Sequence, residues 1–133
     1  MLGELIGEER GTRSVRRVLD VNGEPKVEVS FEADGKIIGL DEHSIVTYVS
    51  TVRPDGSLYG EGKGVVAARD GAVGSWIGAG VGKFGEGGSV SYRGAVYFYS
   101  TSPEWSRLNA VALVFEFEVD PQGNTYSKLW EWK

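Results

Sequence analysis

Apolar and polar residues alternate along most of the chain, and short turn sequences interrupt this alternation at fairly even intervals. Alternation with a period of two is typical of strands that bury one face, and no sustained helical period competes with it. The pattern predicts strands at residues 2–9, 11–21, 26–33, 36–40, 43–53, 57–69, 73–84, 89–100, 107–119 and 125–132.

Turn sequences rich in Gly, Pro, Asn and Asp separate these strands, because such residues accept the backbone angles that tight turns require. They are Asn22-Gly23, Asp34-Gly35, Pro54-Asp55-Gly56, Asp70-Gly71, Gly85-Glu86-Gly87-Gly88, Ser102-Pro103-Glu104 and Asp120-Pro121-Gln122-Gly123-Asn124. The Asp34-Gly35 pair has two interpretations, a hairpin turn or a bulge in one long strand from Lys26 to Leu40. The choice decides how many strands the chain contains, and adjacent short strands can fuse.

So many sequential strands in a chain of 133 residues must close on themselves or divide into two sheets. An open sheet of that width would leave edges unpaired and one face uncovered. Closure is the simpler solution. We therefore predict an all-β fold in which an antiparallel meander of about eight strands closes into a barrel, with residues 1–133 forming a single domain.

Two runs of glycine occupy every second position of neighbouring strands. They are Gly60, Gly62 and Gly64, and then Gly78, Gly80 and Gly82. Because alternate residues of a strand share a face, each run removes the side chains from one face. Such a face permits tight curvature, the close approach of a ring or backbone, or space for a ligand.

Aromatic residues near the glycines are candidates for lining the barrel interior. On strand 89–100, Tyr92, Val96 and Phe98 share one face, and Arg93 and Tyr97 lie on the other. We favour the first face as the interior; the alternative, with Arg93 inside, would suit a small acidic or carbonyl ligand. The predicted ligand-binding residues are Trp76, Phe84, Tyr92, Phe98, Tyr48 and Arg93.

Other candidate chemistry is sparse, and catalytic residues are not identified. The glycine runs are not followed by a helical pattern, which a phosphate-binding loop requires. The single histidine, His43, is expected at an exposed strand start rather than as a general base. Glu116 and Glu118 share a face and are expected to point to solvent or to meet a basic residue such as Lys128. We predict no metal site and no cofactor.

Composition narrows the class of protein further. The formal net charge of −5 and the lack of a basic stripe argue against a nucleic-acid-binding protein. The absence of cysteine excludes disulfides and thiolate chemistry. The sequence shows neither a secretion signal at its start nor an apolar run of membrane-spanning length. We therefore expect a cytoplasmic protein that contacts neither nucleic acid nor membrane.

Strand 107–119 is apolar on both faces. Leu108, Ala110, Ala112 and Val114 form one face, and Val111, Leu113, Phe115 and Phe117 form the other. In a small barrel only one of these faces is core, so the other must be covered. This pattern predicts a homo-oligomer.

The order of several motifs resembles the hairpin spacing of allene-oxide-cyclase-like barrels, and most closely that of small uncharacterised bacterial proteins of this group. The motifs are Thr47-Tyr48, Pro54 to Gly62, Asp70-Gly71, Gly74-Ser75-Trp76, Gly78, Gly80, Phe84 and Tyr92-Arg93-Gly94-Ala95. The resemblance implies an eight-stranded calycin-type barrel, often oligomeric, with an apolar lumen. Known activities in that group include cyclisation of reactive unsaturated substrates. The polar site of a cyclase does not map onto this chain, so the activity is not carried over.

Three functions fit these observations. The barrel can bind a small apolar or amphipathic molecule in its lumen. It can instead be a cyclase or isomerase that uses the same cavity with a Tyr or Glu as acid or base. The third alternative is an oligomeric structural or interaction module with a filled core. A lumen filled by Trp76, Phe84, Tyr92 and Phe98 would favour the third, and an open lumen with an ionisable side chain would favour the second.

Overall fold

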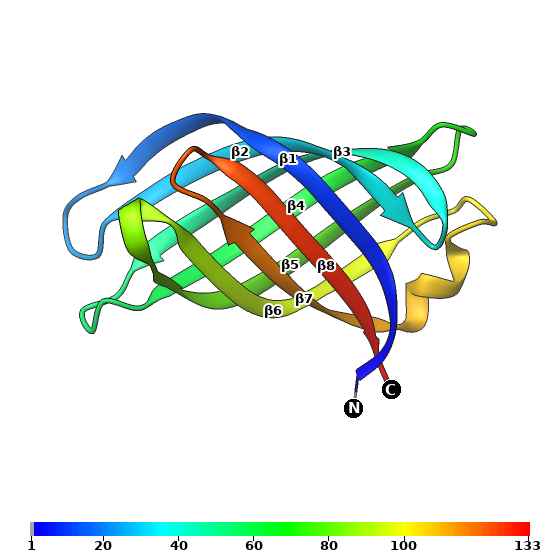
Figure 1. The fold of residues 1–133 in the computed structure, drawn as a ribbon. Coiled ribbons are helices and arrows are strands. Elements are labelled where there is room, and N and C mark those ends of the chain that lie inside the picture. The colour runs from blue at the N-terminus through cyan, green and yellow to red at the C-terminus, as the bar shows by residue number, and fades with distance from the viewer. Residues whose placement is uncertain (1) are drawn as a thin grey trace.

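Eight antiparallel strands in chain order close into a barrel in the computed structural model, which describes residues 2–133 (Figure 1). The strands are β1 (Leu2–Asp20), β2 (Lys26–Ile37), β3 (Leu40–Val52), β4 (Leu58–Ala68), β5 (Val73–Phe84), β6 (Val90–Tyr99), β7 (Ala112–Val119) and β8 (Asn124–Trp132). Two short 3-10 helices, η1 (Glu86–Gly88) and η2 (Ser106–Ala110), lie in the loops before β6 and β7. The predicted all-β barrel is thus confirmed. Met1 lies outside the described residues.

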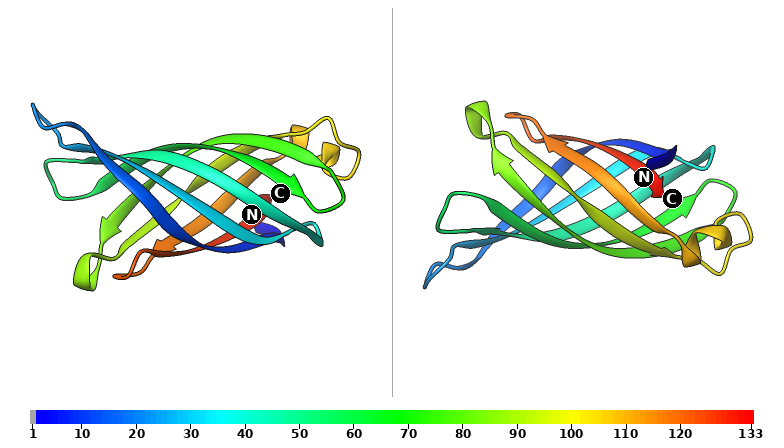
Figure 2. Two further views of the ribbon diagram at one scale, coloured as in Figure 1. Left: turned by 90° about the horizontal axis from the view of Figure 1, so that it is seen from above. Right: turned by 90° about the horizontal axis from the view of Figure 1, so that it is seen from below.

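The long first strand closes the barrel, because it pairs with β2 on one side and with β8 on the other. Figure 1 shows β1 in blue beside β8 in red. Near the middle of β1, Glu9 lies between Gly35 of β2 and Ser127 of β8. Both ends of the described chain and η2 gather at one end of the barrel, and η1 lies at the opposite end (Figure 2).

Four hairpin turns share one local design. In each, an aspartate side chain accepts a hydrogen bond of 2.8–3.0 Å from the backbone N–H two residues later, and a glycine adopts positive φ. The aspartates are Asp20, Asp55, Asp70 and Asp120, and the glycines are Gly23, Gly56, Gly71 and Gly123. Aspartate satisfies the turn backbone locally and glycine accepts positive φ without strain, so these predicted turns are confirmed.

The Asp34-Gly35 pair is neither a turn nor a bulge. The pairing of β2 with β1 and with β3 runs through it without a register shift, and the chain reverses at Ile38-Gly39, both at positive φ. Glycine is required at position 35 because a Cβ atom there would overlap the carbonyl oxygen of Glu8 on β1. The interpretation of one long strand is therefore the correct one.

The glycine runs make space for rings inside the barrel. A Cβ atom at Gly64 would lie 2.5 Å from the indole Nε1 of Trp76, and one at Gly60 would lie 3.0 Å from the ring of Tyr92. The first distance is too short for any real side chain, and the second would force the ring of Tyr92 to shift. Of the three interpretations of the glycine runs, the close approach of rings is therefore directly supported. Several of the same glycines also border the cavity described below.

The residues expected to begin the strand at 107 instead form η2, which covers one end of the barrel. Trp105 and Leu108 are fully buried there, and the Trp105 Nε1 donates a 3.1 Å hydrogen bond to the carbonyl of Ile37. Strand β7 begins only at Ala112. The apolar pattern on two faces of 107–119 is thus partly explained by this cap. None of the helices in residues 2–133 has the length and hydropathy needed to cross a membrane.

Candidate functional site

A cavity of about 90 Å³ lies inside the barrel, between the two packed ends of the core. Seven aromatic residues line it, together with smaller apolar residues, backbone at four glycines, two serines and a single charged residue, Glu9. The aromatic residues are Phe31, Tyr48, Trp76, Tyr92, Phe98, Phe115 and Phe117. The lumen is therefore neither filled nor uniformly apolar.

Four of the six predicted ligand-binding residues border this cavity, namely Tyr48, Trp76, Tyr92 and Phe98. Phe84 does not. It is 54% exposed at the last position of β5, where the strand has already left the lumen for the η1 loop. The prediction that Phe84 lines the lumen was therefore wrong. Phe84 has the same parity along the strand as Trp76, but it lies beyond the enclosed part of the barrel.

Arg93 also lies outside the lumen, on the outer face of β6. Its guanidinium meets two carboxylates of β7, with Nη2 3.2 Å from Glu118 Oε1 and Nε 3.7 Å from Glu116 Oε2. The favoured orientation of β6, with Tyr92 and Phe98 inward, is thus confirmed. The expected basic partner of the two glutamates exists, but it is Arg93 rather than Lys128.

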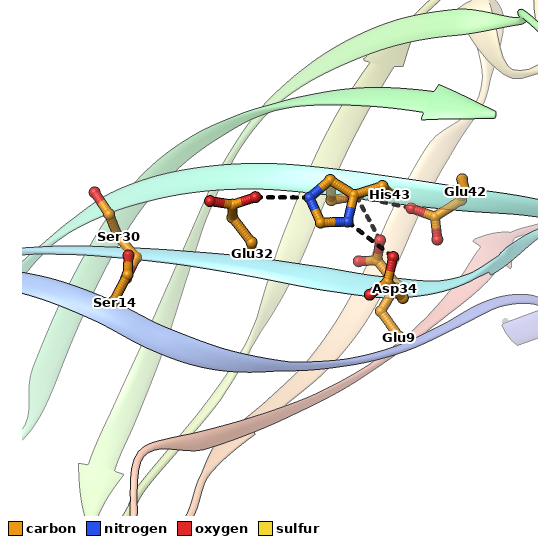
Figure 3. Close-up of polar contacts among 8 residues, drawn as sticks. Glu9, Ser14, Ser30, Glu32, Asp34, Glu42 and His43 are labelled. Carbon is orange, nitrogen blue, oxygen red and sulfur yellow. Dashed lines mark hydrogen bonds and ion pairs between the residues drawn. The ribbon is translucent and has the colours of Figure 1, made fainter. Parts of the chain in front are cut away.

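Glu9 and Ser44 are polar residues of the cavity wall, and Ser44 links Glu9 to Glu42, which lies behind the wall. We call Glu9 and Glu42 the carboxyl pair, and Figure 3 labels both. Ser44 Oγ lies within hydrogen-bond distance of Glu9 Oε2, at 2.5 Å, and of Glu42 Oε1, at 2.8 Å. Ser44 is fully buried and Glu42 is 4% exposed, whereas Glu9 borders the cavity. A hydroxyl carries one proton, so it can donate to only one of these carboxyl groups at a time.

Burial and the neighbouring Glu9 raise the pKa of Glu42 to about 9. Its second oxygen, Oε2, is buried and accepts no hydrogen bond from residues 2–133. A proton on Glu42 removes the buried charge, because the neutral acid is the form that burial favours. Two carboxyl groups that share a site retain one proton between them, so the pair carries one negative charge near neutral pH.

The sequence alone did not identify this cluster, although it held one signal. Glu42 and Ser44 share the inward face of β3 with the predicted Tyr48, and Gly35 separates Glu9 from Glu42 across β2. An inward carboxylate two positions from an inward serine is unusual on a barrel strand, because charged groups are seldom fully buried.

A second polar group lies on the aromatic side of the lumen. Tyr92 Oη hydrogen-bonds with Ser50 Oγ, and the ring of Tyr48 packs edge-on against Tyr92, Phe31 and Phe117. Burial raises the pKa values of both tyrosines above the ordinary value for a phenol. Both phenols are therefore neutral hydrogen-bonding groups at physiological pH.

His43 lies on the outside of the barrel, as expected from the sequence. Its Nδ1 is 2.8 Å from Asp34 Oδ1 and its Nε2 is 2.7 Å from Glu32 Oε1, so β2 holds the imidazole between two carboxylates (Figure 3). These contacts, first with Asp34 and then with Glu32, raise the pKa of His43. The imidazole has no access to the cavity, so it takes no part in the candidate site.

Within residues 2–133, no group of three or more His, Asp and Glu side chains is arranged to hold a metal ion. The outer face carries exposed apolar side chains on β5 and β6, among them Ile77, Tyr97 and Tyr99. These residues are compatible with the predicted homo-oligomer, which stays a prediction.

Comparisons of sequence find no matching family model and no matching curated protein. Comparison of structures finds similar barrels. A Rhodopseudomonas palustris protein of unknown function has a TM-score of 0.83 and 14% identity, with 98% of this chain and 97% of that one covered. An Acinetobacter baumannii protein described as β-barrel-like has a TM-score of 0.82 and 12% identity, with 100% and 96% covered.

A third similar structure is described as an enzyme from Penicillium herquei, with a TM-score of 0.68, 16% identity, and 96% of this chain and 92% of that chain covered. Identities this low show a common fold and nothing finer. Membership of the allene-oxide-cyclase-like group is not confirmed. The chain thus has the fold of a set of small bacterial β-barrels whose function is unknown.

Proposed function

We propose that the barrel binds a small, largely apolar molecule with one polar group in its lumen. The observation that carries this proposal is the cavity itself, an aromatic-lined space with a carboxyl group in its wall. Binding sites for small molecules are typically apolar concavities with a few polar groups that fix orientation.

The volume of the cavity limits the size of the molecule. A buried water needs roughly 10–15 Å³ by this measure, so about 90 Å³ accommodates a molecule of about six to nine non-hydrogen atoms. Larger ligands would require the rings of Trp76 or Phe98 to move.

Filling the lumen is expected to weaken binding strongly without unfolding the barrel. Ser127 borders the cavity beside Glu9 and makes no side-chain hydrogen bond within the described residues, so Ser127→Leu adds apolar volume where space exists. Cyclopentanol is a suitable probe, with binding followed by the shifts of lumenal methyl and ring signals in NMR spectra. We expect saturable shifts in the unmodified protein and a loss of affinity of at least about tenfold in the variant.

The matched control is Ser75→Leu, the same substitution on the exposed outer face of β5. It should leave cyclopentanol binding unchanged. Equal binding by all three proteins would place the probe outside the lumen and contradict the proposal. Native mass spectrometry of the purified protein adds a direct search for a co-purified molecule and reports the subunit number.

A second candidate function is acid–base catalysis of the cyclase or isomerase type, and the carboxyl pair favours it. Glu9 borders the cavity and shares the hydroxyl of Ser44 with the protonated Glu42, so a carboxylate that can accept a proton and a carboxylic acid that can donate one lie in the same cluster. The enzyme from Penicillium herquei shows only that this fold is compatible with catalysis.

Cyclopentanone in D₂O tests this second function. Glu9 would take a proton from the carbon next to the carbonyl group and, after exchange with solvent, return a deuteron to the same carbon. We expect exchange faster than that catalysed by free acetate at the same concentration, and a return to the acetate rate in Glu9→Gln. Exchange that the substitution leaves unchanged would exclude Glu9 as the base.

A further inference from the structure

The cavity contains a negative charge with no cationic partner. Within residues 2–133, no ion pair involves Glu9, which is half-buried at the cavity wall, or Glu42, which is buried. No lysine or arginine borders the cavity among these residues. Buried charges are ordinarily paired, because removal from water is strongly unfavourable.

The surrounding groups cannot fully compensate for that charge. Ser44 supplies a single proton, and Glu42, which is 4% exposed, is the neutral member of the pair, so neither group brings a positive charge to Glu9. The pair can hold one proton between its members, which still leaves one negative charge at the wall of the cavity.

The remainder of the cavity wall favours a positively charged ligand over a negatively charged one. Seven aromatic residues line the same small space. The faces of aromatic rings are electron-rich, so they attract ammonium groups, and this attraction is strongest where water is excluded. Aromatic rings and a carboxylate that line the same cavity thus both favour a positively charged ligand.

We propose that the molecule bound in the lumen is a small organic cation, a protonated amine with an apolar body, whose ammonium group pairs with Glu9. This inference rests on the proposed function, since it names the class of ligand for the same cavity. The apolar body of the amine contacts Trp76 and its neighbours, and the ammonium group donates its hydrogen bonds to the carboxyl pair. Because the ammonium group would then pair with the Glu9 carboxylate, Glu9 could not also act as the base that removes a proton from a substrate. Binding the amine and acting as a base are therefore alternative roles of Glu9.

Cyclopentylamine and cyclopentanol provide a matched pair of probes, equal in ring and in number of non-hydrogen atoms and different in charge at pH 7. Hydrogen bonds to charged groups are stronger than neutral ones, so we expect the amine to bind the unmodified protein about tenfold more tightly or better. Glu9→Gln should remove this preference and bring the ratio of the two affinities to about one, while cyclopentanol still binds.

The control is Glu8→Gln, which neutralises the adjacent residue on the exposed face of β1 and should preserve the preference for the amine. Nuclear Overhauser contacts between the probe and the Trp76 ring confirm that binding is lumenal. Equal affinities in the unmodified protein, or a preference that survives Glu9→Gln, would overturn the inference and leave lumenal binding intact. The absence of lumenal contacts from either probe would overturn both proposals.

Discussion

Replacing Trp105 by alanine is expected to destabilise the barrel by about 3–5 kcal/mol, the usual range for removing a large buried ring. Trp105 is fully buried in the cap formed by the loop around η2, and its ring packs edge-on against Phe98 at a centroid distance of 5.6 Å. Its Nε1 also donates to the carbonyl of Ile37 at the end of β2, so the substitution leaves that acceptor without its donor.

Urea denaturation followed by circular dichroism measures this effect as the change in free energy of unfolding. Trp132→Ala is the matched control, because the Trp132 side chain is 63% exposed at the end of β8. It should change the free energy by less than about 0.5 kcal/mol. Similar values for the two variants would mean that the η2 cap contributes little to stability.

The barrel could be predicted because its information is local. Each Asp–Gly turn satisfies its own backbone, and each strand displays its buried face by alternation, as for Tyr92, Val96 and Phe98. The predictions failed where a contact between segments far apart in the chain determines which residue is needed. Gly35 reads as a turn residue in the sequence, yet it is needed because β1, a segment far away in the chain, lies against it.

The sequence could predict the aromatic wall of the candidate site but not the carboxyl pair, because the pair depends on contacts between distant segments. Alternation placed the aromatic wall, since rings beside glycines on one face belong in a barrel interior. The carboxyl pair depends instead on how β1 is staggered against β2 when the barrel closes. Alternation shows which residues face inward, but the stagger that brings Glu9 level with Glu42 is a property of the closed barrel.

The second large effect concerns Glu42, whose pKa is raised to about 9 by burial and by Glu9. The same carboxyl in the unfolded chain titrates near 4.5. Between these values the folded protein holds a proton that the unfolded chain releases, so the free energy of unfolding falls as pH rises, by up to about 1.4 kcal/mol per pH unit. Below this window the two states are equally protonated, and the loss is absent.

Glu42→Gln should remove this slope and, at pH 8, stabilise the protein by about a few kcal/mol relative to the unmodified chain. The amide mimics the protonated acid, since its oxygen can accept from Ser44 and its nitrogen can donate towards Glu9. Urea denaturation at a series of pH values from 5 to 9 measures the slope, with Glu104→Gln in the exposed η2 loop as the control.

Glu9→Gln separates the two causes of the raised pKa. Burial is the larger cause and remains in this variant, whereas the charge of Glu9 is removed. The upper end of the pH window should therefore move to lower pH, and the total fall in the free energy of unfolding should become smaller without vanishing. A slope unchanged in Glu42→Gln would show that Glu42 does not carry the proton. A slope abolished by Glu9→Gln would instead show that the proximity of the two carboxyl groups, and not their burial, holds the proton inside the barrel.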